Sequence, residues 1–173
     1  KLKAVKDLDA RLNGYQREIQ SYLAGLAENE LKPEESQQAL NLMLYVSNLE
    51  HAGDVIILSL ADRIKAKVKE AIAFTEEETV SLNDLCGICL LYTSDAAGDV
   101  GGARRLLQQK GLFRGIENRV IDSHFRGPLA KGKPLRRSAL FVDLVRDLHT
   151  VNTHVTSAAY PIVEAAGLLR ETR

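Results

Sequence analysis

The chain has no tryptophan and only one methionine, two cysteines and four prolines among its 173 residues. Two cysteines cannot make a disulfide framework, so the composition fits a reducing compartment. No apolar run approaches the roughly 20 residues that a membrane-spanning helix needs, and no signal-peptide pattern opens the chain. Alternation of polar and apolar residues is scarce, which excludes most strand-based folds. The sequence therefore predicts an all-α protein.

Neither sign of charge dominates, since 23 basic residues face 23 acidic ones. An even balance gives no overall field to attract a polyanion, so we expect no nucleic-acid partner. Hydrophobic residues make up 45% and charged residues 27% of the chain, as in folded globular proteins. This length corresponds to one ordinary domain or to two small bundles with a shared core.

Apolar residues recur at steps of three and four, the spacing of a helix that packs on one face. Pro33 with two following acids indicates a helix start, the Thr75–Glu78 stretch is a capping box, and Ser138 is a suitable N-cap. We expect a loop at 127–137 and a turn at 98–102. The sequence predicts five helices, at about 2–28, 33–74, 75–94, 99–125 and 138–167.

These five helices suggest two units, a first bundle at 1–74 and a second bundle at 75–173. The second unit has three helices, which suffices for an up-down-up bundle. The first has only two, and a further helix before Lys1 would complete it. Because the chain also begins without methionine, we expect it to be a piece of a longer protein.

The stretch 47–56 departs from ordinary helix rules twice. Glu50 and Asp54 lie one turn apart, so their carboxylates share a face and repel each other. Gly53 between them costs a helix interior roughly 0.5–1 kcal/mol relative to alanine. We therefore expect another part of the chain to approach closely at Gly53. A cation that joins Glu50 and Asp54 would offset their repulsion, although a solvated helix face has the same pattern.

The last predicted helix carries a second candidate group. Asp143, Asp147 and His154 share one helical face, since seven residues make nearly two turns, and they are candidate metal ligands. The alternative is that Asp147 only forms a salt bridge with an arginine such as Arg146 or Arg119. His149 and Asn152, on other faces, are expected to make hydrogen bonds between helices.

Three other patterns favour structural interpretations. Cys86 and Cys89 match a C-x-x-C redox motif but lie inside a helix, so packed thiols are expected. The glycines at 98–102 lack the strand and the Gly-Lys-Ser/Thr of a phosphate-binding loop. Five basic residues fall within twelve positions and predict a solvated loop or a contact with anionic lipid headgroups or a transporter: Arg126, Lys131, Lys133, Arg136 and Arg137.

Residues 49–54 read L-E-H-A-G-D and resemble the L-E-R-I-G-D signature of PhoU-like domains. Residues 144–161 read L-V-R-D-L-H-T-V-N-T-H-V-T-S-A-A-Y-P. They resemble the last helix of the PhoU-like domain at the C-terminus of bacterial Na+/phosphate cotransporter family proteins. The order of the predicted helices extends this resemblance to essentially the whole chain.

The resemblance implies two three-helix bundles, of which the first lacks its first helix here. It implies a regulatory role in sodium-dependent phosphate transport rather than catalysis, and a cytoplasmic location at the inner face of the cell membrane. The implied partners are a transmembrane transport domain of the same chain or a phosphate transporter, and a second copy in a homodimer. It also implies an iron or zinc site at Glu50 and Asp54, whereas their carboxylate oxygens with one possible imidazole suit magnesium, calcium, manganese or iron. His149 and Thr153 replace the second pair of acids, and Asp143 with Asp147 is the nearest substitute.

Two further function classes use helices of the same kind. A metal-free helical adaptor that binds a partner protein would need the same helices but no ion. A di-iron enzyme would need Glu-x-x-His on two helices, and no glutamate here has a histidine three residues later. No arrangement of nucleophile and base is visible, so we expect no enzymatic activity.

Overall fold

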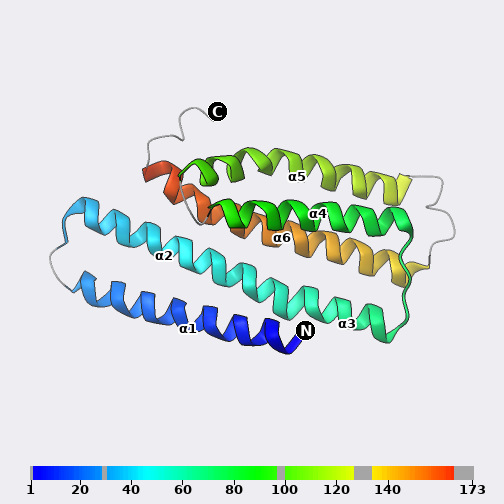
Figure 1. Ribbon diagram of the computed structural model, residues 1–173, viewed down its shortest axis with the longest axis horizontal. Helices are drawn as coiled ribbons and strands as arrows, with labels where there is room; N and C mark the ends of the chain where they lie inside the picture. Colours follow the sequence, from blue (N-terminus) through cyan, green and yellow to red (C-terminus); the bar gives the residue numbers. More distant parts are fainter. Residues whose placement is uncertain (1, 29–30, 97–99, 127–133, 166–173) are drawn as a thin grey trace.

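The computed structural model describes residues 2–28, 31–96, 100–126 and 134–165. This part of the chain is all-α, as predicted. It forms an elongated bundle whose helix axes lie roughly along one long axis, with chain directions both ways (Figure 1). In chain order the elements are α1 (Leu2–Ala27), α2 (Pro33–Asp54), η1 (Val55–Leu60), α3 (Ala61–Lys69), α4 (Glu76–Ala96), α5 (Val100–Arg126) and α6 (Leu135–Ala165).

α2, η1 and α3 follow each other without a break and form the single long helix that was predicted to start at Pro33. Within it, η1 is a π-helix, in which the backbone N–H of Ala61 donates to the carbonyl oxygen of Ile56. Such a bond spans five residues instead of four, and π turns often occur at functional sites. The residues of α3 are therefore rotated about the axis relative to an uninterrupted α-helix.

α6 is the central helix of the molecule, since α2, η1, α3, α4 and α5 all contact it. Figure 1 shows α2 and α6 side by side with opposite chain directions. One hydrophobic cluster joins these two helices through Ala52, Val151, Val155, Ala159 and Val163. A second cluster joins α6 to α4 and α5, and it comprises Leu85, Cys89, Phe113, Val120, Phe141, Val145 and Leu148. Because both clusters share α6, the division into units at 1–74 and 75–173 stays a prediction.

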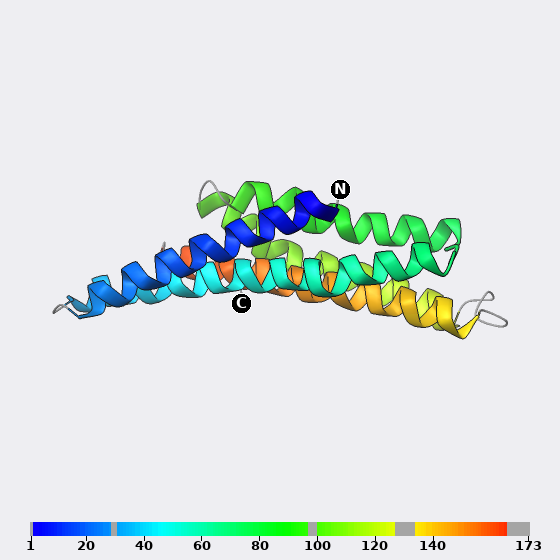
Figure 2. The same cartoon turned by 90° about the horizontal axis from the view of Figure 1, so that it is seen from below.

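α1 packs on α2, and the contact confirms the close approach expected at Gly53. A Cβ atom at Gly53 would lie 3.0 Å from Leu12 Cδ2, closer than ordinary packing allows. Toward its N-terminal end α1 moves away from α2 and toward the side of the molecule where α4 lies (Figure 2). Gly53 thus fixes α1 at mid-length and leaves its first turns farther from α2.

The predicted helix starts at Pro33 and near Thr75 are confirmed. Pro33 occupies the first turn of α2, where Glu35 Oε2 accepts from the backbone N–H of Lys32 at 3.0 Å. At α4 the capping box is reciprocal: Glu78 N–H donates to Thr75 Oγ1 at 3.1 Å, and Thr75 N–H donates to Glu78 Oε2 at 2.9 Å. These bonds satisfy donors that a helix end leaves without partners.

Two predicted boundaries were wrong. The long helix stops at Lys69 rather than near Phe74, because Ala71 adopts a left-handed conformation with a φ of 50°. Ile72 N–H donates to Lys67 O and Ala71 N–H to Val68 O, the pattern that closes a helix. α6 begins at Leu135, so Ser138 lies inside it and is not the N-cap.

The two predicted non-helical segments fall partly outside the described residues. Positions 127–133 of the expected loop and 98–99 of the expected turn are among those not described, and so is the expected break near Gly167. Of the remainder, Arg136 and Arg137 belong to α6, and Gly101 and Gly102 belong to α5. Both segments are therefore shorter than the sequence indicated, since helices extend into them.

Candidate functional site

The candidate site follows the contact between α6 and the long helix formed by α2, η1 and α3. We call this contact the α2–α6 seam; its apolar middle is Ala52, Val151 and Val155, all buried. Small or branched side chains at these positions let the two helices approach closely. Polar and charged residues flank this apolar middle at both ends, and they include most of the candidate ligands predicted from the sequence.

At one end of the seam, Arg63 of α3 binds both acids of α6. Its Nε lies 2.5 Å from Asp147 Oδ2, and its Nη1 lies 2.6 Å from Asp143 Oδ2. Arg146 also donates to Asp143, at 2.8 Å. The Asp147 side chain is only 9% exposed, so its charge depends on the guanidinium for compensation. Asp147 is thus in a salt bridge, but its partner is Arg63 and not Arg146 or Arg119.

At the other end of the seam, His154 of α6 meets α2. Its Nδ1 lies 3.2 Å from Asn48 Oδ1, and its ring lies 5.3 Å from the ring of His51 between centroids. Burial lowers the pKa of His154, and the neighbouring His51 lowers it further. His154 therefore favours the neutral form, in which Nδ1–H can donate to the asparagine oxygen.

Glu50 and Asp54 lie on α2 between these two ends. The Glu50 side chain is 16% exposed, and its Oε2 lies 3.7 Å from His51 Nε2. Asp54 is the last residue of α2 and directly precedes the π turn. The two carboxylates therefore remain one helical turn apart, as predicted, next to an irregular turn of the same helix.

The five predicted metal ligands do not converge on one point. Asp143 and Asp147 are engaged by Arg63, and His154 by Asn48. Across the described ranges, no three His, Cys, Asp or Glu side chains are placed to hold one ion. A multinuclear iron or zinc centre needs more ligands than this. The Glu50–Asp54 pair alone suits a hydrated ion such as Mg²⁺, which often uses one or two carboxylates.

Sequence reasoning missed a second charged cluster, at the junction of α4, α5 and α6. Glu78 and His124 are each 4% exposed, and His124 Nδ1 lies 3.3 Å from Glu78 Oε1. Arg137 Nε lies 3.6 Å from Glu78 Oε2, and the His124 ring stacks on Phe141 at 4.7 Å. The capping box identified Glu78 as a helix-start residue, but nothing in the sequence linked it to positions so far along the chain.

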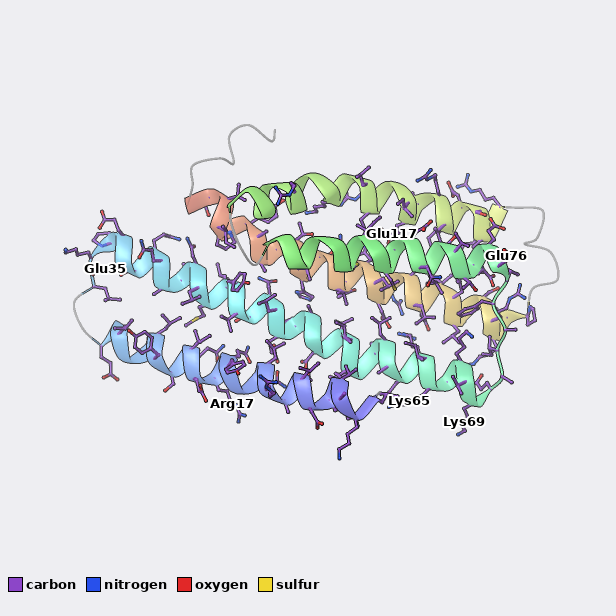
Figure 3. The ribbon with its side chains drawn as sticks, viewed as in Figure 1. Arg17, Glu35, Lys65, Lys69, Glu76 and Glu117 are labelled. Atoms are coloured by element: carbon purple, nitrogen blue, oxygen red, sulfur yellow. The ribbon has the colours of Figure 1, made fainter. Side chains whose placement is uncertain are left out.

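His149 confirms the expectation that it makes a hydrogen bond between helices. Its Nδ1 lies 2.8 Å from Oε2 of Glu117, which projects from α5 (Figure 3). The ring of His149 also contacts the edge of Phe113 in the core. His149, at a position where PhoU-like domains have an acid, is therefore already hydrogen-bonded to Glu117 of the neighbouring helix α5.

The cysteines and the basic cluster have structural surroundings in the described residues. Cys89 is buried in the core and Cys86 is partly buried against it, which confirms packed thiols, and burial raises the pKa of Cys89 to about 12 and also raises that of Cys86. Three members of the predicted basic loop are helical and paired: Arg126 with Asp122, Arg136 with Glu70, and Arg137 with Glu78. These three residues are not on a loop, contrary to the expectation.

Comparison with known proteins finds relatives that are named for phosphate export. It is 30% identical over 168 residues to a Salmonella typhimurium protein named "Putative inorganic phosphate export protein YjbB". The protein of that name from Escherichia coli K12 is 26% identical over 168 residues. These names describe export and no enzymatic reaction, which agrees with the prediction that the chain is not an enzyme. No family model matches the chain, and no solved structure matches it significantly.

The alignment covers 94% of this chain but only 31% of the relatives, so the chain spans about a third of their length. Among the described residues, no helix combines the length and the apolar character needed to cross a membrane. The similarity thus concerns one helical region of a much longer transport-related protein.

Proposed function

We propose that the chain is a regulatory, PhoU-like helical domain of a phosphate transport protein. The proposal rests on the sequence similarity to proteins named for phosphate export. The similarity covers 94% of this chain and 31% of the length of those proteins. A region that aligns almost end to end, yet contains no membrane-crossing helix among its described residues, suits a control function better than a pore.

The proposed partner is the transmembrane transport portion of the same protein or of a separate phosphate transporter, at the cytoplasmic face of the membrane. The α2–α6 seam is the element through which such a domain would respond. Its two polar ends, Arg63 with Asp147 and Asn48 with His154, hold α6 against the long helix. Sliding or separating these helices would break two part-buried pairs at once, which favours two discrete arrangements over gradual change.

Metal binding is proposed only for Glu50 and Asp54, with a hydrated divalent ion such as Mg²⁺ as ligand. The test is elemental analysis of protein prepared without chelator and then incubated with each metal, beside a Glu50→Ala/Asp54→Ala variant. Retention by the parent chain and loss in the variant would support the site. Equal content in both would leave the pair as part of the bundle and favour the metal-free adaptor.

The regulatory role is tested by replacing the aligned region of the Salmonella relative with this chain. Release of radiolabelled phosphate from loaded cells is then measured against internal phosphate concentration. Three proteins are compared: the chimera, a relative lacking the region, and a chimera with Arg63→Met. A regulatory domain changes the phosphate concentration at which export begins, while maximal export per transporter in the membrane is retained.

Two results would contradict the proposal. Export by the deleted relative could match that of the chimera at every phosphate level, which would remove any role of this region in transport. Alternatively, maximal export could vanish on deletion even though the relative still reaches the membrane, which would make the region part of the transport path. Immunoblotting of membrane fractions corrects each rate for the amount of protein.

A further inference from the structure

An apolar groove of about 550 Å³ lies among α1, η1, α3, α4 and α6. Leu2 and Val5 of α1 form one wall, and Leu82 and Cys86 of α4 form the opposite one. Residues of η1, α3 and α6 complete it: Ile56, Leu60, Ala61, Ile64, Leu144 and Leu148. Apolar side chains that five elements contribute to one open groove mark a binding surface rather than scattered exposure.

The packing of α1 explains why this groove is open. α4 packs against both α5 and α6, whereas α1 packs mainly against α2. The first turns of α1 lean toward the α4 side (Figure 2), yet Leu2 and Val5 remain 37% exposed. Ile64 on the facing helix is 50% exposed. α4 has two neighbouring helices, α5 and α6, whereas α1 has mainly α2. A helix inserted between α1 and α4 would give α1 a second neighbour.

The border of the groove is basic on the side of α1 and α3. Lys67 lines the groove itself, and Lys3 and Lys6 flank the lining residues Leu2 and Val5. Within the described residues none of these three lysines forms an ion pair, and the Lys67 ammonium lies 5.0 Å from the centroid of the Phe74 ring, which also lines the groove. The nearby Asp62 is bound by Lys65, which lowers its pKa, as Lys6 does to a smaller extent. On the α4 side the lining polar residues are Thr79 and Asn83, which are uncharged.

From this apolar floor and lysine border we infer that the groove binds an acidic amphipathic helix of a partner protein. One face of that helix carries aliphatic residues that pack on Leu60, Ile64 and Cys86. Its flank toward α1 and α3 carries Asp or Glu opposite Lys3, Lys6 and Lys67. Such helix-in-groove recognition takes specificity from charge and affinity from buried aliphatic area. The inference goes beyond phosphate transport and does not depend on it.

The test uses two synthetic 20-residue helical peptides with the same leucine and isoleucine seam, one flanked by glutamates and the other by lysines. Fluorescence anisotropy measures their binding to the chain at low and at high salt. We expect the glutamate peptide to bind at least tenfold more tightly, and the difference to shrink at high salt. Ile64→Gln should weaken binding about tenfold, while Val68→Gln, on the same helix but outside the groove lining, should not.

Cys86 provides a readout of location. In a Cys89→Ala background, the glutamate peptide should slow alkylation of Cys86 by a maleimide, and the lysine peptide should not. Circular dichroism confirms that each variant folds. The inference is overturned if neither peptide binds, if both bind equally, or if Cys86 stays equally reactive with bound peptide. It is also overturned if light scattering finds a dimer that Ile64→Gln dissociates, because a second copy would then occupy the groove.

Discussion

Arg63 and Asp147 join α3 to α6 through an Nε–Oδ2 contact of 2.5 Å across 84 positions of sequence. Because the carboxylate is nearly inaccessible to water, the pair is more than a surface salt bridge. Breaking such a pair by removing one partner leaves an uncompensated charge, which is far costlier than losing an exposed pair. We therefore expect this contact to contribute more to stability than an exposed salt bridge does.

The first prediction follows from the low exposure of the Asp147 carboxylate. Arg63→Met is expected to lower the free energy of unfolding by about 3 kcal/mol, because Asp147 stays buried without its cation. Urea unfolding measures the change. Lys65→Met is the matched control two residues away, since it removes only the exposed pair with Asp62 and should cost less than about 1 kcal/mol. Similar losses for the two variants would mean that the Arg63 pair contributes no more than a surface contact.

A second prediction concerns the approach of α1 to α2. Gly53→Val is expected to cost about 1–3 kcal/mol, because its side chain would meet Leu12 where a Cβ alone lies at 3.0 Å. A Cβ atom at Gly111 in α5 would meet nothing within 4 Å, so Gly111→Val should be neutral or slightly stabilising. Hydrogen exchange should show faster exchange of α1 amides in the Gly53 variant alone. Unchanged exchange in α1 would contradict the fixed contact.

A third prediction concerns pH. The pKa of His154 is lower in the folded chain than in the unfolded one, so the unfolded state binds more protons as pH falls through this range. Stability contributed by neutral His154 is therefore present above its unfolded pKa of about 6.5 and is lost on acidification. Thermal unfolding between pH 7 and pH 5 should show a steeper loss for the parent chain than for His154→Asn. Parallel pH profiles would refute the coupling.

The end of α3 gives a fourth prediction. Ala71 has a φ of 50°, a conformation that costs an L-residue roughly 1–2 kcal/mol and costs glycine little. Ala71→Gly should therefore raise the free energy of unfolding by up to about 1 kcal/mol after the greater entropy of unfolded glycine is subtracted. Chemical denaturation measures it. Ala66→Gly, inside α3, should instead be destabilising by a comparable amount.

The parts of the fold that sequence could supply were those encoded locally. Steps of three and four apolar residues predicted the helices, and Thr75 with Glu78 located the start of α4 because both partners of the capping box are three residues apart. The end of α3 was not predicted because Ala71 occupies the helix-ending position at which glycine is the usual sequence signal. The residues of η1 form no pattern from which a π turn could be predicted.

The candidate site was harder to predict because its partners are distant in sequence. The shared face of Asp143, Asp147 and His154 was visible from spacing alone, and all three do lie against the long helix. What spacing could not reveal is which residue faces them. That depends on how α6 is aligned along α2 and α3, and Arg63 and Asn48 are consequences of this alignment. The metal hypothesis for Glu50 and Asp54 stays a prediction.

The central place of α6 has a consequence for how the chain folds. α6 is the last of the described helices to leave the ribosome, yet both hydrophobic clusters are built on it. The contacts that it makes, such as His154 with Asn48 across 106 positions, close very long loops. Helical proteins fold fast when their contacts are local, so here the earlier helices must wait with their apolar faces open. Synthesis halted before α6 would leave a chain of formed helices without a core, prone to aggregation.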